Sequence, residues 1–229
     1  MTLNSKKEEY LIYKLADNMK NCIKIDADLF RKLDVKRGLR NEDGTGVLVG
    51  LTNIGNVVGY ERTENGLKPI EGKLYFRGYE ISDLVHAVLN EQRFGFEEIA
   101  YLLLSGGLPD AEELEQFRHL LVGNMPLMSK TMLNIVELEG TDIMNILARS
   151  VLELYTYDNT PDDISRENLM RQSVELISKF PTIIAYAYNM LRHKTFGRSL
   201  HIRHPKENFS LAENFLYMLL GNNYTPLDA

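Results

Sequence analysis

The chain has 229 residues and carries 32 acidic against 26 basic side chains, which gives a net charge of −6. That length can bury a substantial core in one large domain or two small ones. An acidic molecule lacks the overall positive field that nucleic-acid binding requires. No apolar segment reaches the roughly 20 residues that span a bilayer, and the single cysteine, Cys22, fits a reducing cytosol. We therefore expect a cytoplasmic protein with neither nucleic acid nor membrane as a partner.

Two short helices are predicted near the N-terminus. Residues 8–20 place apolar side chains at mostly helical spacing, and Asp26 is positioned as the N-cap of a second helix over residues 27–33. We interpret residues 1–37 as an N-terminal helical extension rather than a domain.

Residues 38–81 hold most of the chain's glycines and are predicted to form a small β-meander. Turn-forming pairs such as Glu71-Gly72 separate its short β-prone runs. Since so small and glycine-rich a sheet does not fold alone, we expect it to lie on a helical body, which it enters through an exposed Arg77-Gly78-Tyr79 corner. The predicted runs are residues 47–51, 56–61, 67–70 and 73–76.

From residue 82 to residue 229 the spacing of apolar side chains becomes helical, and seven or eight helices are expected. Ser82 marks the start of the first, and Gly106 ends the second. Pro181 is expected to open a separate helix over residues 182–194, because proline is tolerated in a helix's first turn. The predicted fold is all-α, with a small sheet near the N-terminus. Further helices are predicted after the capping residues Asp110, Ser129, Asp142, Ser165 and Ser210.

The glycines Gly44, Gly46 and Gly50 suggest a phosphate-binding loop, but the patterns that define one are absent. There is no G-x-x-x-x-G-K-[ST] sequence, and Val49 stands where the third glycine of G-x-G-x-x-G belongs. Hairpin turns are the favoured interpretation of these residues.

Cysteine and histidine residues define no clear catalytic or metal site. Cys22 has no evident activating partner, so a small core residue is favoured over a catalytic thiol. His86 and His119 lie on predicted helix faces without an acid or thiol at a catalytic spacing. His201 and His204 form the only close pair, but no third ligand follows at a usual metal-binding spacing.

Basic side chains are densest between residues 192 and 206. An anionic ligand, such as a phosphorylated cofactor, is one interpretation of this cluster. The favoured interpretation is a solvated helix end, because the helix dipole attracts cations at the C-terminus. The cluster consists of Arg192, His193, Lys194, Arg198, His201, Arg203, His204 and Lys206.

Neighbouring carboxylates do not define a site either. Pairs such as Glu97-Glu98 and Asp162-Asp163 lie in predicted helix first turns or in a loop, and none is clearly placed in an apolar pocket that would raise a pKa. A G-x-S-x-G elbow is also absent. Residue chemistry alone therefore predicts a helical scaffold with no catalytic and no metal-binding residues of its own, and it leaves cofactor-binding residues undetermined.

Five runs of sequence follow one another in the chain: GLRNEDGTGVLVGLTNIGNVVGY, EGKLYFRGYEISDLV, FGFEEIAYLLLSGGLPDAEELEQF, FPTIIAYAYN and FSLAENFLYMLLGNNYTP. Taken in this order, they resemble the N-terminal half of citrate synthase of the bacterial type. In that family an RG-[YF]-x-I-x-[DE]-L corner leads from a small β element into the large helical domain, and Arg77 to Leu84 match it. The resemblance covers residues 36–226.

The resemblance implies an all-α, two-domain homodimer that condenses acetyl-CoA with oxaloacetate to citrate and free CoA. Acetyl-CoA is then a substrate, and no cofactor is bound permanently. In the family an Asp removes a proton from the acetyl methyl, one His stabilises the enol, a second His polarises the ketone, and several Arg hold the carboxylates. The family's H-x-D-H, G-P-x-H-G and G-[FY]-G-H motifs and its catalytic Asp follow the F-L-Y-M-L-x-G helix, and none of them matches a position of this chain.

We therefore expect this chain to be the N-terminal large-domain segment of a longer enzyme, inactive by itself. A 2-methylcitrate synthase, which uses propionyl-CoA, is an alternative that has the same fold. A non-catalytic helical scaffold derived from the family is a second alternative from a different class.

Overall fold

The computed structural model describes residues 26–32, 38–40, 46–47, 52–64, 66–137 and 140–224. The chain divides into two compact units, Met1–Leu51 and Thr52–Ala229. No helix in the described ranges has the length and the apolar character needed to cross a bilayer.

The first unit contains the short helix that was predicted after Asp26. This helix, α2, spans Ala27–Lys32, and the Asp26 carboxylate accepts a hydrogen bond of 3.0 Å from the amide of Asp28. The capping prediction is therefore confirmed. The predicted helix over residues 8–20 lies outside the described residues, as does all of the predicted run 47–51 except Val47.

The sheet of the second unit has three antiparallel strands in the order β1-β2-β3: β1 spans Gly55–Thr63, β2 Gly66–Phe76 and β3 Tyr79–Glu80. The predicted runs 67–70 and 73–76 belong to one strand, so the turn expected at Glu71-Gly72 is wrong. Val58 pairs with Lys73 and Tyr60 with Pro69. Because the three β2 residues between these pairs, residues 70–72, lie opposite one residue of β1, Gly72 lies in a bulge within the strand rather than in a turn.

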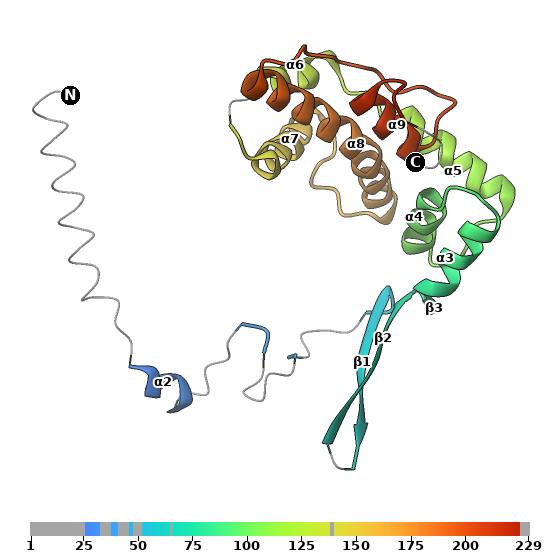
Figure 1. Cartoon of the computed structure of the whole chain (residues 1–229), viewed down its shortest axis with the longest axis vertical. Coiled ribbons are helices and arrows are strands. Elements are labelled where there is room, and N and C mark those ends of the chain that lie inside the picture. Colours follow the sequence, from blue (N-terminus) through green and yellow to red (C-terminus); the bar gives the residue numbers. More distant parts are fainter. Residues whose placement is uncertain are drawn as a thin grey trace, which may run out of the picture. The chain divides into compact units, whose positions relative to one another are not determined.

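Most of the sheet is not packed against helices, although its small size led us to expect that it would lie on the helical body. In β2 the first strand residues are exposed, and the half-buried side chains gather at the end near β3, at Leu74, Tyr75 and Phe76. In Figure 1 the two long strands run side by side and join the helices at that end.

Seven helices follow the sheet in the described chain, which confirms an all-α fold with a small sheet near the N-terminus (Figure 1). They are α3 (Ile81–Asn90), α4 (Phe96–Ser105), α5 (Ala111–Asn124), α6 (Ser129–Glu137), α7 (Ile143–Tyr157), α8 (Arg166–Phe196) and α9 (Leu211–Leu220).

Most helix starts lie where the capping residues predicted them. Asp110 with Glu113 and Ser210 with Glu213 form complete capping boxes, in which each side chain bonds the other residue's amide. Helix α3 differs, because it begins at Ile81 and its N-cap is Glu80 rather than Ser82. The Ser82 hydroxyl instead donates a hydrogen bond to the Glu80 carboxylate at 3.1 Å.

The separate helix predicted after Pro181 does not exist, because α8 continues through that residue. Proline removes one backbone hydrogen bond and is costly inside a helix. Tertiary contacts around it offset this cost: Thr182 and Ile183 are fully buried, and the Thr182 hydroxyl donates to the Met125 carbonyl at 3.0 Å. Packing therefore overrides the local signal to begin a new helix.

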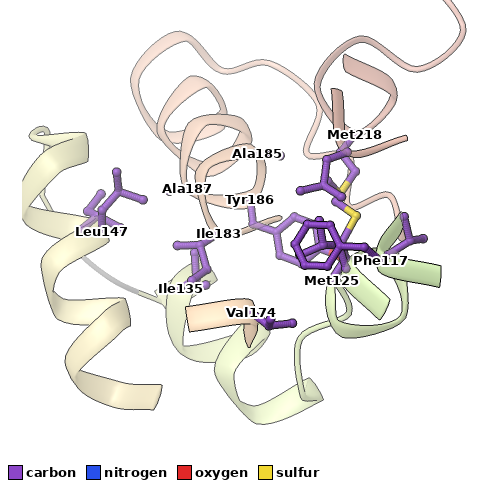
Figure 2. Close-up of a cluster of buried hydrophobic side chains, with 14 residues drawn as sticks. Phe117, Met125, Ile135, Leu147, Val174, Ile183, Ala185, Tyr186, Ala187 and Met218 are labelled. Atoms are coloured by element: carbon purple, nitrogen blue, oxygen red, sulfur yellow. The ribbon is translucent and has the colours of Figure 1, made fainter. Parts of the chain in front are cut away.

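The core lies between α8 and the helices around it. Helices α5, α6, α7 and α9 all pack against α8. Figure 2 shows the apolar side chains from these helices gathered about Ile183 and Tyr186. The buried cluster comprises Phe117, Leu121, Val122, Met125, Ile135, Ile146, Leu147, Val174, Ile183, Ala185, Tyr186, Ala187, Leu211 and Met218.

Candidate functional site

The corner between the sheet and the helices is a two-residue turn from β2 to β3. Arg77 has φ of 49° and Gly78 has φ of 91°, and positive values at both positions are the signature of a type I′ hairpin turn. Glycine adopts this conformation freely, whereas the left-handed region costs another residue on the order of 1 kcal/mol. The contacts of the Arg77 side chain must therefore offset that cost.

Arg77 joins this corner to the end of α4. Its Nη2 and Nε donate to the Leu103 carbonyl at 2.7 and 3.2 Å, and its Nη1 donates to Asn53 Oδ1 at 3.3 Å. Carbonyls in the last turn of a helix lack intrahelical partners and attract positive charge. The side chain is half-buried rather than exposed as expected, so its first role is structural.

A cavity of about 680 Å³ opens beside this corner. Arg77 is the one charged residue among those that line it, and its guanidinium is bound as described above. The described residues that line the cavity therefore offer amide, hydroxyl and backbone groups for binding, and none of them carries a carboxylate, imidazole or thiol for proton transfer. The lining residues are Thr52, Asn53, Gly55, Asn56, Tyr75, Arg77, Gly78 and Gly106.

The predicted basic cluster begins in the last turns of α8 and continues into the segment between α8 and α9. We call this segment, residues 197–210, the strap. His193 lies in the last turn of α8, as the helix-end interpretation requires, and its Nδ1 is 2.6 Å from the Arg198 carbonyl. His204 Nδ1 is 3.4 Å from the Tyr186 hydroxyl. These contacts tie the strap to α8.

Two more members of the cluster bind to aromatic rings or to α9. The Lys206 ammonium lies 4.0 Å from the centre of the Tyr217 ring and 4.6 Å from that of Phe209, which are cation–π distances. Arg203 Nη1 donates to the Met218 carbonyl at 3.2 Å. These two cations therefore hold the strap on α9.

The other candidates are not brought together. Within the described ranges, no three His, Cys, Asp or Glu side chains are grouped in a way that would hold a metal ion. His119 Nε2 lies 3.2 Å from Glu115 on its own helix, and the His86 side chain is exposed. Cys22 and Gly44 lie outside the described residues, as does Gly50.

The carboxylates that are neighbours in the sequence bind different partners in the structure. Glu97 is buried and accepts a hydrogen bond from the Leu211 amide at 2.9 Å. Glu98 is paired with Arg93. Asp162 accepts a hydrogen bond from the Tyr155 hydroxyl, and this contact raises the pKa of Tyr155.

Sequence reasoning missed a polar network between the end of α7 and the start of α8. Arg171 Nη2 donates to both carboxylate oxygens of Asp158, at 2.7 and 2.8 Å, and to Asn168 Oδ1 at 2.7 Å. Gln172 Nε2 and the Thr160 amide donate to the same carboxylate. The Arg171 guanidinium, followed by these two donors, holds the pKa of Asp158 well below its usual range. No local spacing reveals this pairing, because a loop separates the two charged residues.

Replacing Arg77 with alanine should lower the free energy of unfolding by about 2 kcal/mol, because a charge-assisted bond to the Leu103 carbonyl is lost. Urea unfolding measures the change. Arg118→Ala is the control, because that guanidinium pairs with the exposed Glu115 in its own helix, and it should change stability by less than about 0.5 kcal/mol. Equal effects of the two substitutions would contradict the role given to Arg77.

The low pKa of Asp158 predicts a specific pH dependence. A depressed carboxyl pKa contributes stability above the unfolded value, about 4, and this contribution disappears as pH falls towards the folded value. Asp158→Asn should therefore be less stable than the parent protein at pH 7, and the difference should shrink below about pH 4. Urea unfolding across this range tests it, with the exposed Glu207→Gln as control. A difference that stays constant with pH would show that the charge is not involved.

Comparisons with known proteins agree with one another. The family model described as "Citrate synthase, C-terminal domain" matches residues 42–229. The chain is 33% identical over 164 residues to citrate synthase of Deinococcus radiodurans, which covers 69% of this chain and 42% of that protein. It is 29% identical over 161 residues to citrate synthase 2 of Bacillus subtilis, covering 69% and 40%.

A solved structure shows the same similarity in three dimensions. Citrate synthase from Pyrobaculum aerophilum superposes with a TM-score of 0.63 at 27% sequence identity, covering 80% of this chain and 42% of that one. The chain therefore spans about two fifths of the length of the relatives that it matches.

Proposed function

The chain belongs to the citrate synthase family, and we propose on this basis that the full-length protein condenses acetyl-CoA with oxaloacetate to give citrate and free CoA. The observation that carries the proposal is the family match over residues 42–229, a range that includes all seven helices α3 to α9. The 33% identity to a citrate synthase over 69% of the chain supports it.

The proposed reaction makes one carbon–carbon bond and breaks one thioester bond. A base takes a proton from the acetyl methyl, and the resulting carbon nucleophile attacks the ketone carbon of oxaloacetate, whose oxygen gains a proton. Water then cleaves the thioester, so that citrate and CoA leave. These steps need a base, a donor to the thioester oxygen and cations for the dicarboxylate.

In this proposal residues 82–229 supply part of the large domain, and residues 1–37 and 38–81 supply an N-terminal extension and a glycine-rich β element. The reacting groups come from outside residues 1–229; among the described residues, no three His, Cys, Asp or Glu side chains are grouped as a metal site, and Arg77, Arg203, Lys206 and Glu97 make structural contacts. The 229-residue chain alone is then inactive. We further propose a cytoplasmic protein without a permanently bound cofactor, and without a nucleic-acid or membrane partner.

An exposed apolar stripe on α7 supports the proposal of a homodimer. Met144 and Leu152 are 72% and 73% exposed, and Tyr155 is 55% exposed. With the exposed Ala148, they recur every three or four residues and so lie on one face of the helix. An apolar helix face of this kind marks a contact surface, and the same stripe on a second copy would form a two-fold interface.

Leu152→Glu should convert the full-length dimer to a monomer, because it places a charge within this stripe. Light scattering after size-exclusion chromatography measures the mass. Ile164→Glu is the matched control, since that side chain is 83% exposed and lies outside α7, and it should leave the dimer intact. A Leu152→Glu protein that remains dimeric would exclude this face as the interface.

The function itself is tested by steady-state kinetics on the full-length protein. Release of CoA is measured with oxaloacetate and either acetyl-CoA or propionyl-CoA. The proposal predicts turnover with both substrates present and a higher kcat/KM for acetyl-CoA. A preference for propionyl-CoA would identify a 2-methylcitrate synthase instead, and no turnover with either thioester would favour a scaffold without catalysis.

A further inference from the structure

Polar groups from remote segments hold both ends of α9. At its start, Ser210 and Glu213 form the capping box, and the Glu97 carboxylate accepts the Leu211 amide at 2.9 Å. Glu97 belongs to α4 and is only 1% exposed. The first turn of α9 is therefore fixed by its own cap and also by a buried acceptor 114 residues away.

The middle of α9 holds the strap through one amide side chain. Asn214 is fully buried, and its Oδ1 accepts the Lys206 amide at 2.7 Å. Its Nδ2 donates to the Lys206 carbonyl at 3.0 Å and to the Phe209 carbonyl at 3.3 Å. The position of the strap therefore depends on which side of α9 faces it, because Asn214 must point towards the strap backbone.

The last turn of α9 is held by two side-chain donors from other segments. The Met218 carbonyl accepts from Asn189 Nδ2 of α8 at 3.1 Å and from Arg203 Nη1 of the strap at 3.2 Å. Gly221 follows with φ of 71° and ψ of −128°, a conformation that favours glycine. A Cβ added there would meet Arg203 Nη2 at 3.1 Å and Cζ and Nε at 3.3 Å. The plane of the guanidinium therefore lies against Gly221.

We infer that Arg203 and Gly221 together set the direction in which the chain continues from α9, and that Arg203 is a positioning residue for the proposed condensation. Its planar group both binds the Met218 carbonyl and occupies the space beside Gly221, so the two residues allow one path at residues 222–224. The Asn189 bond to the same carbonyl is buried, and buried polar contacts can specify an arrangement beyond what stability requires.

This inference rests on the proposed function, in which the reacting groups lie beyond residue 229. Bond-forming steps are sensitive to misplacement of such groups by about 1 Å. A change in the direction of the chain after α9 should therefore lower the rate of reaction more than it alters the affinity for either substrate.

The test uses two independent variants of the full-length protein, Arg203→Lys and Gly221→Ala. Lysine keeps the charge but not the planar fork. Alanine is strained at the φ of 71° that Gly221 adopts, and its Cβ would lie 3.1 Å from Arg203 Nη2, closer than an ordinary van der Waals contact. The control is Arg198→Lys, the same substitution at an exposed arginine of the strap. For each protein kcat, KM, the melting temperature and hydrogen exchange over residues 219–224 are measured.

The inference predicts that both variants lower kcat by roughly ten- to a hundredfold, with KM for each substrate within about twofold and faster exchange over residues 219–224. The control should match the parent protein. Unchanged exchange, or faster exchange with an unchanged kcat, would overturn the inference. A parent protein with no condensing activity would instead overturn the proposed function, and the exchange measurement would still decide whether Arg203 and Gly221 constrain the end of α9.

Discussion

The burial of α8 among α5, α6, α7 and α9 holds the helical part of the second unit together. Apolar side chains of α5, α6, α7 and α9 meet this helix, and its middle is lined by small residues such as Ala185 and Ala187 beside the large Tyr186. Small side chains let the neighbouring helices approach closely, and the tyrosine fills the space that remains. That packing keeps α8 continuous through Pro181, against the local preference of the residue.

Buried polar side chains between these helices fix the positions of the helices relative to one another. Thr182 joins α8 to the end of α5, Asn189 joins it to α9, and Asn214 joins α9 to the strap. Each of these side chains is buried and hydrogen-bonded, so none carries the penalty of an unsatisfied polar group. The result is a frame whose ends, and above all the end of α9, are placed by specific contacts as well as by apolar packing.

Local signals predicted the starts of the helices well, because capping depends on residues within one turn. Asp110 and Ser210 are examples, each with its glutamate three residues later. Features of the structure that depend on tertiary contacts were not predicted correctly from the sequence. Pro181 did not begin a helix, Gly72 lies in a bulge, and the pairing of Asp158 with Arg171 depends on a loop that no periodicity describes. The basic cluster was visible in the sequence, but the partners of Arg203 and Lys206 appear only once α9 is folded against the strap.

We propose that this helical frame positions reacting groups that it does not itself contain. The test is the release of CoA from acetyl-CoA and oxaloacetate, compared between the purified 229-residue chain and the full-length protein at equal concentration. We expect turnover by the full-length protein and none by the 229-residue chain. Turnover by the shorter chain would contradict it, because the reacting groups would then have to lie among residues 1–229.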